Sequence, residues 1–241
     1  MTTLVAIGCS HTSGSMIDGR NGTSEYNVAN TFAGVIAKKH NMKYHNLGLP
    51  GGSNAYIYRS TIKFINEQMK ADEDYIFLIG WTSTARIELR YPDNSASEYN
   101  TLAEFVDKKY MPFSVGIEKS LMLTREAKEL VDNIELIIDY ETLAYNWATY
   151  ALVLQKLFEH KKIKYIMFNT CYDMPVNASN LKIIEKLDRK TYIDPLALNK
   201  SFLYWSLEKG FKKTECWHMR EDAHRTWAMF LEKRLLILGH L

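Results

Sequence analysis

Short uninterrupted hydrophobic runs alternate along the chain with longer segments in which hydrophobic residues recur every three or four positions. The hydrophobic runs predict buried strands at 3–9, 75–80 and 163–169. A further short strand is predicted at 43–49, before the turn at 50–54. The helical spacing predicts helices at 27–40, 55–69, 140–161 and 221–237.

Strands and helices that alternate in this way are typical of a parallel sheet with helices on both faces. We therefore expect an α/β protein: a three-layer α/β/α sandwich of flavodoxin-like type with a mostly parallel central sheet. Residues 91–134 break the alternation, because a turn at Pro92–Ser95 is followed by scattered aromatic residues among polar ones. We expect a single domain over 1–241 with an insertion at about 91–134.

Composition narrows the possible partners. The 241 residues are 46% hydrophobic and 24% charged, as in a soluble globular domain, and 30 basic against 28 acidic residues leave no basic footprint for nucleic acid. No run approaches membrane-spanning length and the first residues lack signal-peptide features, so we expect a cytoplasmic protein that binds no membrane. The odd, scattered set of Cys9, Cys171 and Cys216 argues for a reducing compartment rather than a disulfide framework.

Residues that could form a nucleophile and its base lie near the two ends of the chain. Ser10 follows the first predicted strand, and Glu215 stands three residues before His218. A serine hydroxyl becomes nucleophilic when an imidazole takes its proton, and a carboxylate orients that imidazole. Because loops after strand carboxyl ends line the ligand crevice of an open parallel sheet, we expect Gly51 and Thr82 to meet Ser10 and His218 there.

Each of these residues also has a purely structural interpretation. An isolated serine at this position is commonly a turn or helix-capping residue, and His218 with Glu215 can equally be a helix-capping histidine beside a solvated carboxylate. A metal site formed by Glu215, His218 and His224 is disfavoured, because their spacing does not put both histidines on one helical face. We expect no metal, and a structural role for His224.

The order and rough spacing of these motifs resemble the SGNH, or GDSL-like, hydrolase superfamily over nearly the whole chain. Residues 8–14, Gly-Cys-Ser-His-Thr-Ser-Gly, resemble the block that carries the nucleophilic serine, with Cys9 in the place of the usual aspartate. Residues 46–53 are similar to the block whose glycine N–H binds the oxyanion, and Gly51 is the matching residue. The resemblance implies the three-layer fold and an ester-cleaving activity without metal or organic cofactor.

The resemblance also implies a Ser–His–Glu triad. Ser10 is then the nucleophile, His218 the base, and Glu215 the acid in place of the more usual aspartate. The N–H groups of Ser10 and Gly51 hold the oxyanion. Thr82 stands where the family's third block, Gly-x-Asn, has the asparagine that donates to the oxyanion. The threonine hydroxyl has a shorter reach than an amide, and losing one such donor costs about 10²–10³ in turnover.

The substrate is less closely defined, since the family's range includes carbohydrate O-acetyl esters, small acyl esters and lipids. Trp81, Arg86 and Asn54 are candidate substrate-binding residues, and the aromatic residues near Trp81 favour an acetylated sugar. An arginine fork suits a carboxylate or phosphate, although Arg86 can equally pair with Glu88 on the surface. We expect a small-molecule or glycan ester as the partner, and the sequence leaves the oligomeric state open.

Two other functions remain open. Thr82, Cys9 and Met219 depart from the family pattern, which is also expected of a catalytically weakened or inactive glycan-binding or structural protein with the same fold. An acyltransferase with the same triad would pass the acyl group to another hydroxyl. The Gly-Cys-Ser-His-Thr start and Trp81 also resemble SGNH-type proteins of large bacteriophages, which implies a host glycan or a modified phage component as substrate.

Overall fold

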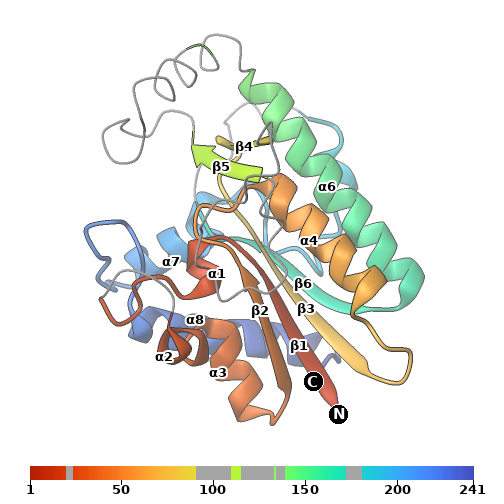
Figure 1. The fold of residues 1–241 in the computed structure, drawn as a ribbon, viewed down its shortest axis with the longest axis vertical. Coiled ribbons are helices and arrows are strands. Elements are labelled where there is room, and N and C mark those ends of the chain that lie inside the picture. The colour runs from red at the N-terminus through yellow and green to blue at the C-terminus, as the bar shows by residue number, and fades with distance from the viewer. Residues whose placement is uncertain (20–23, 91–109, 115–132, 134–138, 172–180) are drawn as a thin grey trace.

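A computed structural model describes residues 1–19, 24–90, 110–114, 133, 139–171 and 181–241 (Figure 1). Its centre is a four-stranded, all-parallel sheet in the order β2-β1-β3-β6. The strands are β1 (Thr2–Gly8), β2 (Lys43–Gly48), β3 (Asp74–Trp81) and β6 (Lys164–Asn169). Each lies within a residue or two of a predicted strand, so the predicted parallel sheet is confirmed.

Helices cover both faces of the sheet (Figure 1). They are α1 (Ser10–Ser13), α2 (Glu25–Ala29), α3 (Phe32–Lys39), α4 (Asn54–Glu67), α6 (Tyr140–Lys161), α7 (Phe202–Glu208) and α8 (Glu221–Ile237), with 3-10 helices at Ile184–Lys186 and Leu198–Lys200. Helices α4 and α6 pack on one face, and α3, α7 and α8 on the other. The three-layer α/β/α architecture is confirmed.

Side chains from the strands divide between the two helical layers by simple alternation. In β1, Val5 and Ile7 belong to the core beneath α4 and α6, whereas Leu4 and Ala6 belong to the core beneath α3 and α8. Successive side chains of a strand point to opposite faces, so a strand buried on both sides needs a continuous hydrophobic run. The sequence pattern therefore reflects burial on both faces rather than strand formation alone.

The predicted helix at 27–40 is interrupted at Asn30, the C-cap of α2, and Thr31, the N-cap of α3. The Thr31 hydroxyl donates to Val28 O (2.9 Å) and accepts from the Gly34 N–H (2.9 Å). A threonine that caps a new helix satisfies N–H groups left without an intrahelical partner. Helix α7 was not predicted by the hydrophobic spacing.

The insertion expected at about 91–134 falls mostly outside the described residues. Its described part includes β5 (Tyr110–Ser114), which pairs antiparallel with β4 (Arg86–Arg90). This small sheet lies beyond the carboxyl end of β3 (Figure 1). The single-domain organisation stays a prediction.

Candidate active site

The short helix α1 lies directly on a row of glycines at the carboxyl edge of the sheet. Gly8 ends β1 and is in register with Gly48 of β2 and Gly80 of β3. A Cβ atom on Gly8 would come within 2.1 Å of Thr12 Oγ1, and one on Gly48 within 2.3 Å of the Ser13 backbone nitrogen. Real side chains do not approach so closely, so this glycine row is what allows α1 to rest on the strands.

Ser10 is the first residue of α1 and is only 5% exposed. The carbonyl of Cys9 accepts the N–H groups of Thr12 and Ser13, each at 2.9 Å. The Ser13 hydroxyl donates to Ser10 O at 2.9 Å. These contacts fix the backbone of the predicted nucleophile at the point where β1 ends.

His218 lies at the end of a tight loop. The N–H of Thr214 donates to His218 O (2.8 Å), and the N–H of His218 donates to Thr214 Oγ1 (3.1 Å). Trp217 takes a left-handed conformation (φ 62°), and Glu215, Cys216 and Trp217 are all exposed between them. The predicted triad acid therefore lies on the solvent side of the loop, and within the described part of the chain no hydrogen bond or ion pair joins Glu215 to His218.

His11 of the first motif lies beside His218 of the last motif. Its ring centroid is 5.3 Å from that of His218, and neither Nδ1 has a hydrogen-bond partner among the described residues. Burial, followed by the proximity of His11 and the charge of Arg86, lowers the pKa of His218 to about 4; the Cys216 backbone carbonyl acts in the opposite direction. At neutral pH the His218 imidazole is therefore uncharged and able to accept a proton.

His224 is buried behind this pair and serves the packing. Its Nδ1 accepts the backbone N–H of Phe32 (3.3 Å), and its ring stacks on Phe32 with centroids 5.6 Å apart. Burial lowers the pKa of His224 well below its ordinary value. The contact anchors the start of α3 to α8.

The loop after β3 is held by Asn54 and Arg86. Asn54 is 5% exposed; its side-chain oxygen accepts the N–H of Thr82 (2.9 Å), and its side-chain nitrogen donates to Thr82 O (3.1 Å). Arg86 Nη1 donates to the Thr82 hydroxyl (2.9 Å), while Glu88 pairs with Arg59 (2.5 Å). The amide of Asn54 is thus committed to the protein backbone, and Arg86 faces Thr82.

Trp81 lies inside the core, whereas Gly51 lies in a half-buried turn near the sheet edge. Trp81 is fully buried in the core beneath α4 and α6, so it does not line an open crevice. Gly51 lies in a half-buried turn with φ 76°, a conformation that favours glycine. The turn is joined to the end of β1, since the N–H of Leu49 donates to Gly8 O (3.0 Å). Gly51 therefore lies at the same sheet edge as Ser10.

Sequence reasoning missed His11 and the pair Thr170–Cys171 at this edge. Both could have been found: His11 is part of the first motif, and Cys171 follows the fourth predicted strand, whose carboxyl end must reach the same edge. Cys9 Sγ lies 3.2 Å from Thr170 Oγ1, so the ends of β1 and β6 are in contact.

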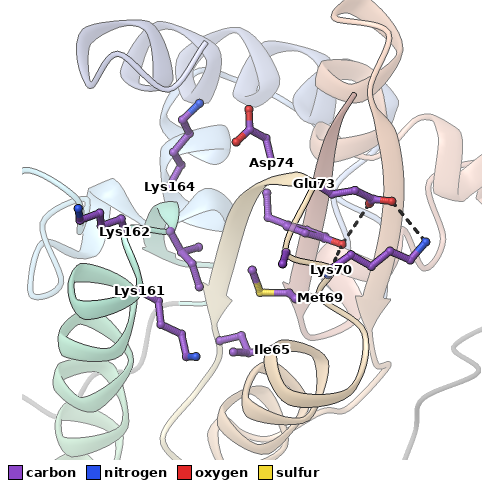
Figure 2. A pocket seen from close by; sticks show the side chains of 11 residues that line it. Ile65, Met69, Lys70, Glu73, Asp74, Lys161, Lys162 and Lys164 are labelled. Carbon is purple, nitrogen blue, oxygen red and sulfur yellow. Dashed lines mark hydrogen bonds and ion pairs between the residues drawn. The ribbon is translucent and has the colours of Figure 1, made fainter.

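A separate pocket of about 450 Å³ opens at the opposite end of the strands (Figure 2). It lies near Asp74, which begins β3, and Lys164, which begins β6. Lys70 is paired with Glu73 across one side (3.4 Å). The amino ends of the strands lie away from Ser10 and His218, so this pocket is not part of the candidate site.

No protein-family model and no curated protein matches the sequence. The fold is similar to that of a carbohydrate esterase family 2 enzyme with a carbohydrate-binding domain from Corynascus thermopiles (Myceliophthora fergusii): TM-score 0.51, 10% identity, 98% of this chain and 66% of that chain. A putative lipolytic protein of the G-D-S-L family from Desulfitobacterium hafniense DCB-2 gives a TM-score of 0.45, 13% identity, and 98% and 100% coverage. The chain has the SGNH hydrolase fold. A Clostridium thermocellum family two carbohydrate esterase, in complex with cellohexaose, matches the SGNH fold of this chain with a TM-score of 0.49, 12% identity, and 100% and 65% coverage.

Two further observations concern metal binding and membrane-spanning helices. Within the described ranges, no group of three or more histidine, cysteine, aspartate or glutamate residues is placed to bind a metal ion. None of the helices in the same part of the chain has the length and apolar character needed to cross a bilayer.

Proposed function

We propose that the protein is a serine esterase of the SGNH type that cleaves its substrate by acyl transfer to Ser10. The observation that carries the proposal is the meeting of two distant motifs. Helix α1, which begins with Ser10, is held on the glycine row, and the adjacent His11 ring lies 5.3 Å from the ring of an uncharged His218.

In the proposed reaction His218 removes the proton from Ser10 Oγ as this oxygen attacks the ester carbonyl. The N–H groups of Ser10 and Gly51 stabilise the oxyanion. The Thr82 hydroxyl accepts from Arg86, so its own proton remains available as a third donor. His218 then returns its proton to the leaving alcohol, and activates the water that releases the acid from the acyl-enzyme.

The acid of the triad needs a separate test. Glu215 matches the family motif, but its carboxylate is exposed, whereas the Cys216 carbonyl acts directly on the pKa of His218. If Glu215 orients the imidazole during turnover, Glu215→Gln lowers kcat by about 10²-fold or more. A Glu215→Gln enzyme with wild-type kcat would instead support a Ser10–His218 pair.

For the substrate we propose a carbohydrate O-acetyl ester. The fold is shared with a carbohydrate esterase, and an aromatic residue stands beside the proposed base: Trp217 is 49% exposed, with Lys213 Nζ 3.4 Å from its ring centroid. Trp217 replaces the buried Trp81 as the candidate sugar platform. Acid release from acetylated sugars, short acyl esters and lipid esters, compared at equal concentration, tests this choice.

A fluorophosphonate probe tests the nucleophile directly, because it reacts only with an activated serine. We expect labelling at Ser10, located by peptide mass, and none in Ser10→Ala or His218→Ala. Ser206→Ala is the matched control, since Ser206 is a buried serine of α7 outside the site. An unlabelled, folded wild-type protein would refute the esterase and favour a glycan-binding protein of the same fold.

A further inference from the structure

Two cysteine side chains from strands that are not neighbours meet beside the candidate site. Cys9 follows β1, and Cys171 follows β6, with β3 between those strands. Both sulfur atoms contact Thr170 Oγ1, at 3.2 Å for Cys9 and 3.7 Å for Cys171. The two sulfurs therefore lie against the same threonine hydroxyl.

The surroundings distinguish the two sulfurs. Thr82 Oγ1 lies 3.8 Å from Cys171 Sγ and accepts from Arg86 Nη1, so the Arg86 guanidinium lies on the Cys171 side of the site. The neighbouring Cys9 side chain and then the Arg86 charge lower the pKa of Cys171 despite its burial, while burial raises the pKa of Cys9. Cys171 is thus the more acidic of the two thiols.

Exposure follows the same division. Cys171 is 9% exposed and Cys9 is completely buried. A small oxidant such as hydrogen peroxide reaches Cys171 first, and a thiolate is the form that reacts with it. The buried neighbouring thiol is then placed to attack the product.

We propose that Cys171 is a site of reversible oxidation by a peroxide, that Cys9 resolves it to a disulfide, and that the disulfide inactivates Ser10. The Cys171 thiolate attacks one peroxide oxygen; the O–O bond breaks, giving a sulfenic acid and hydroxide, which becomes water on protonation. The Cys9 sulfur loses its proton and attacks Cys171 Sγ. The S–O bond breaks, and the departing hydroxide takes up that proton as a second water. The two thiols lose two electrons, and the peroxide gains them.

Disulfide formation must disturb α1. An S–S bond is about 2.05 Å long, much shorter than any contact between two sulfurs that are not bonded to each other. Cys9 is the N-terminal cap residue of α1, and its carbonyl holds the N–H groups of Thr12 and Ser13. Drawing Cys9 toward Cys171 therefore displaces Ser10, the next residue. This last step rests on the proposed function, whereas the disulfide itself does not.

The experiment treats the reduced full-length protein with hydrogen peroxide and maps its peptides by mass. We expect a Cys9–Cys171 cross-link that dithiothreitol removes. In Cys9→Ser, which lacks the resolving thiol, dimedone should trap a sulfenic acid at Cys171. The exposed Cys216 serves as an internal comparison in every sample. Oxidation at Cys216 with Cys9 and Cys171 left as thiols would overturn the proposal, provided thermal melting shows the variants folded.

The same samples are then labelled with the fluorophosphonate. We expect labelling of Ser10 to fall at least about tenfold in oxidised wild type, to recover with dithiothreitol, and to persist in peroxide-treated Cys171→Ser. A cross-link that leaves Ser10 labelling unchanged would overturn the coupling to α1. A reduced protein that cross-links but never labels at Ser10 refutes the esterase and leaves the oxidation site standing, so the two failures are distinguishable.

Discussion

Replacing Asn54 by alanine should destabilise the protein by removing the support of the loop after β3. Its amide accepts the Thr82 N–H at 2.9 Å and donates to Thr82 O at 3.1 Å, and Thr82 is completely buried. A buried group left without a partner costs about 1–3 kcal/mol. Alanine's better helix propensity at this first position of α4 returns at most roughly 0.7 kcal/mol. We expect Asn54→Ala to lower the free energy of unfolding by about 2–4 kcal/mol.

Urea unfolding at pH 7, followed by circular dichroism, measures this difference. Asn66→Ala is the matched control, because Asn66 is an exposed residue of the same helix and undergoes the same substitution. Its effect should stay within about 0.5 kcal/mol. If Asn54→Ala loses less than about 1 kcal/mol relative to Asn66→Ala, the amide does not hold Thr82 as the structure indicates.

Three further perturbations test the site and its packing. Folding lowers the pKa of His218 from 6.5 to about 4, so the unfolded chain binds more protons than the folded chain between these two pH values. The free energy of unfolding should therefore fall by up to roughly 3 kcal/mol as the pH drops from 6.5 to about 4. Urea midpoints should show a smaller slope in His218→Gln, and equal slopes would contradict the assignment. Gly8→Ala, whose Cβ would lie 2.1 Å from Thr12 Oγ1, should lower the melting temperature and Ser10 labelling together; a variant with a wild-type melting temperature refutes the packing. Ser206→Ala removes a buried hydroxyl without a partner among the described residues, so unfolding should show unchanged or slightly higher stability, and a loss above about 1 kcal/mol would reveal a hidden partner.

The parallel sheet was predictable because a strand buried on both faces needs an unbroken hydrophobic run. Trp81 shows where that reasoning stopped too early. The third strand was expected to end at residue 80, but β3 continues to Trp81, which pairs with Asn169 of β6. Alternation then puts Trp81 on the same face as Phe77 and Ile79, inside the core. An element boundary shifted by one residue thus changed a proposed binding residue into a core residue.

The candidate site was only partly predictable. The rule that strand carboxyl ends share one edge predicts Ser10 and Gly51 at the same edge of the sheet, where the structure places both; their catalytic roles stay a prediction. The contact of Cys9 and Cys171 with the same Thr170 hydroxyl depends on the strand order β2-β1-β3-β6, which the order along the chain does not determine. The outward position of Glu215 depends on a left-handed Trp217, and tryptophan gives no sequence signal for that conformation.

The glycine row also has a consequence for folding kinetics. Helix α1 has four residues and no side-chain cap at its start, and so short a helix is not stable in isolation. It acquires its position only when the segments that end in Gly48, Gly8 and Gly80 have paired, which requires contacts between distant parts of the chain. During refolding, the reactivity of Ser10 should therefore appear with the completed sheet and not before it. The time course of covalent labelling at Ser10 would then report when the whole sheet has assembled.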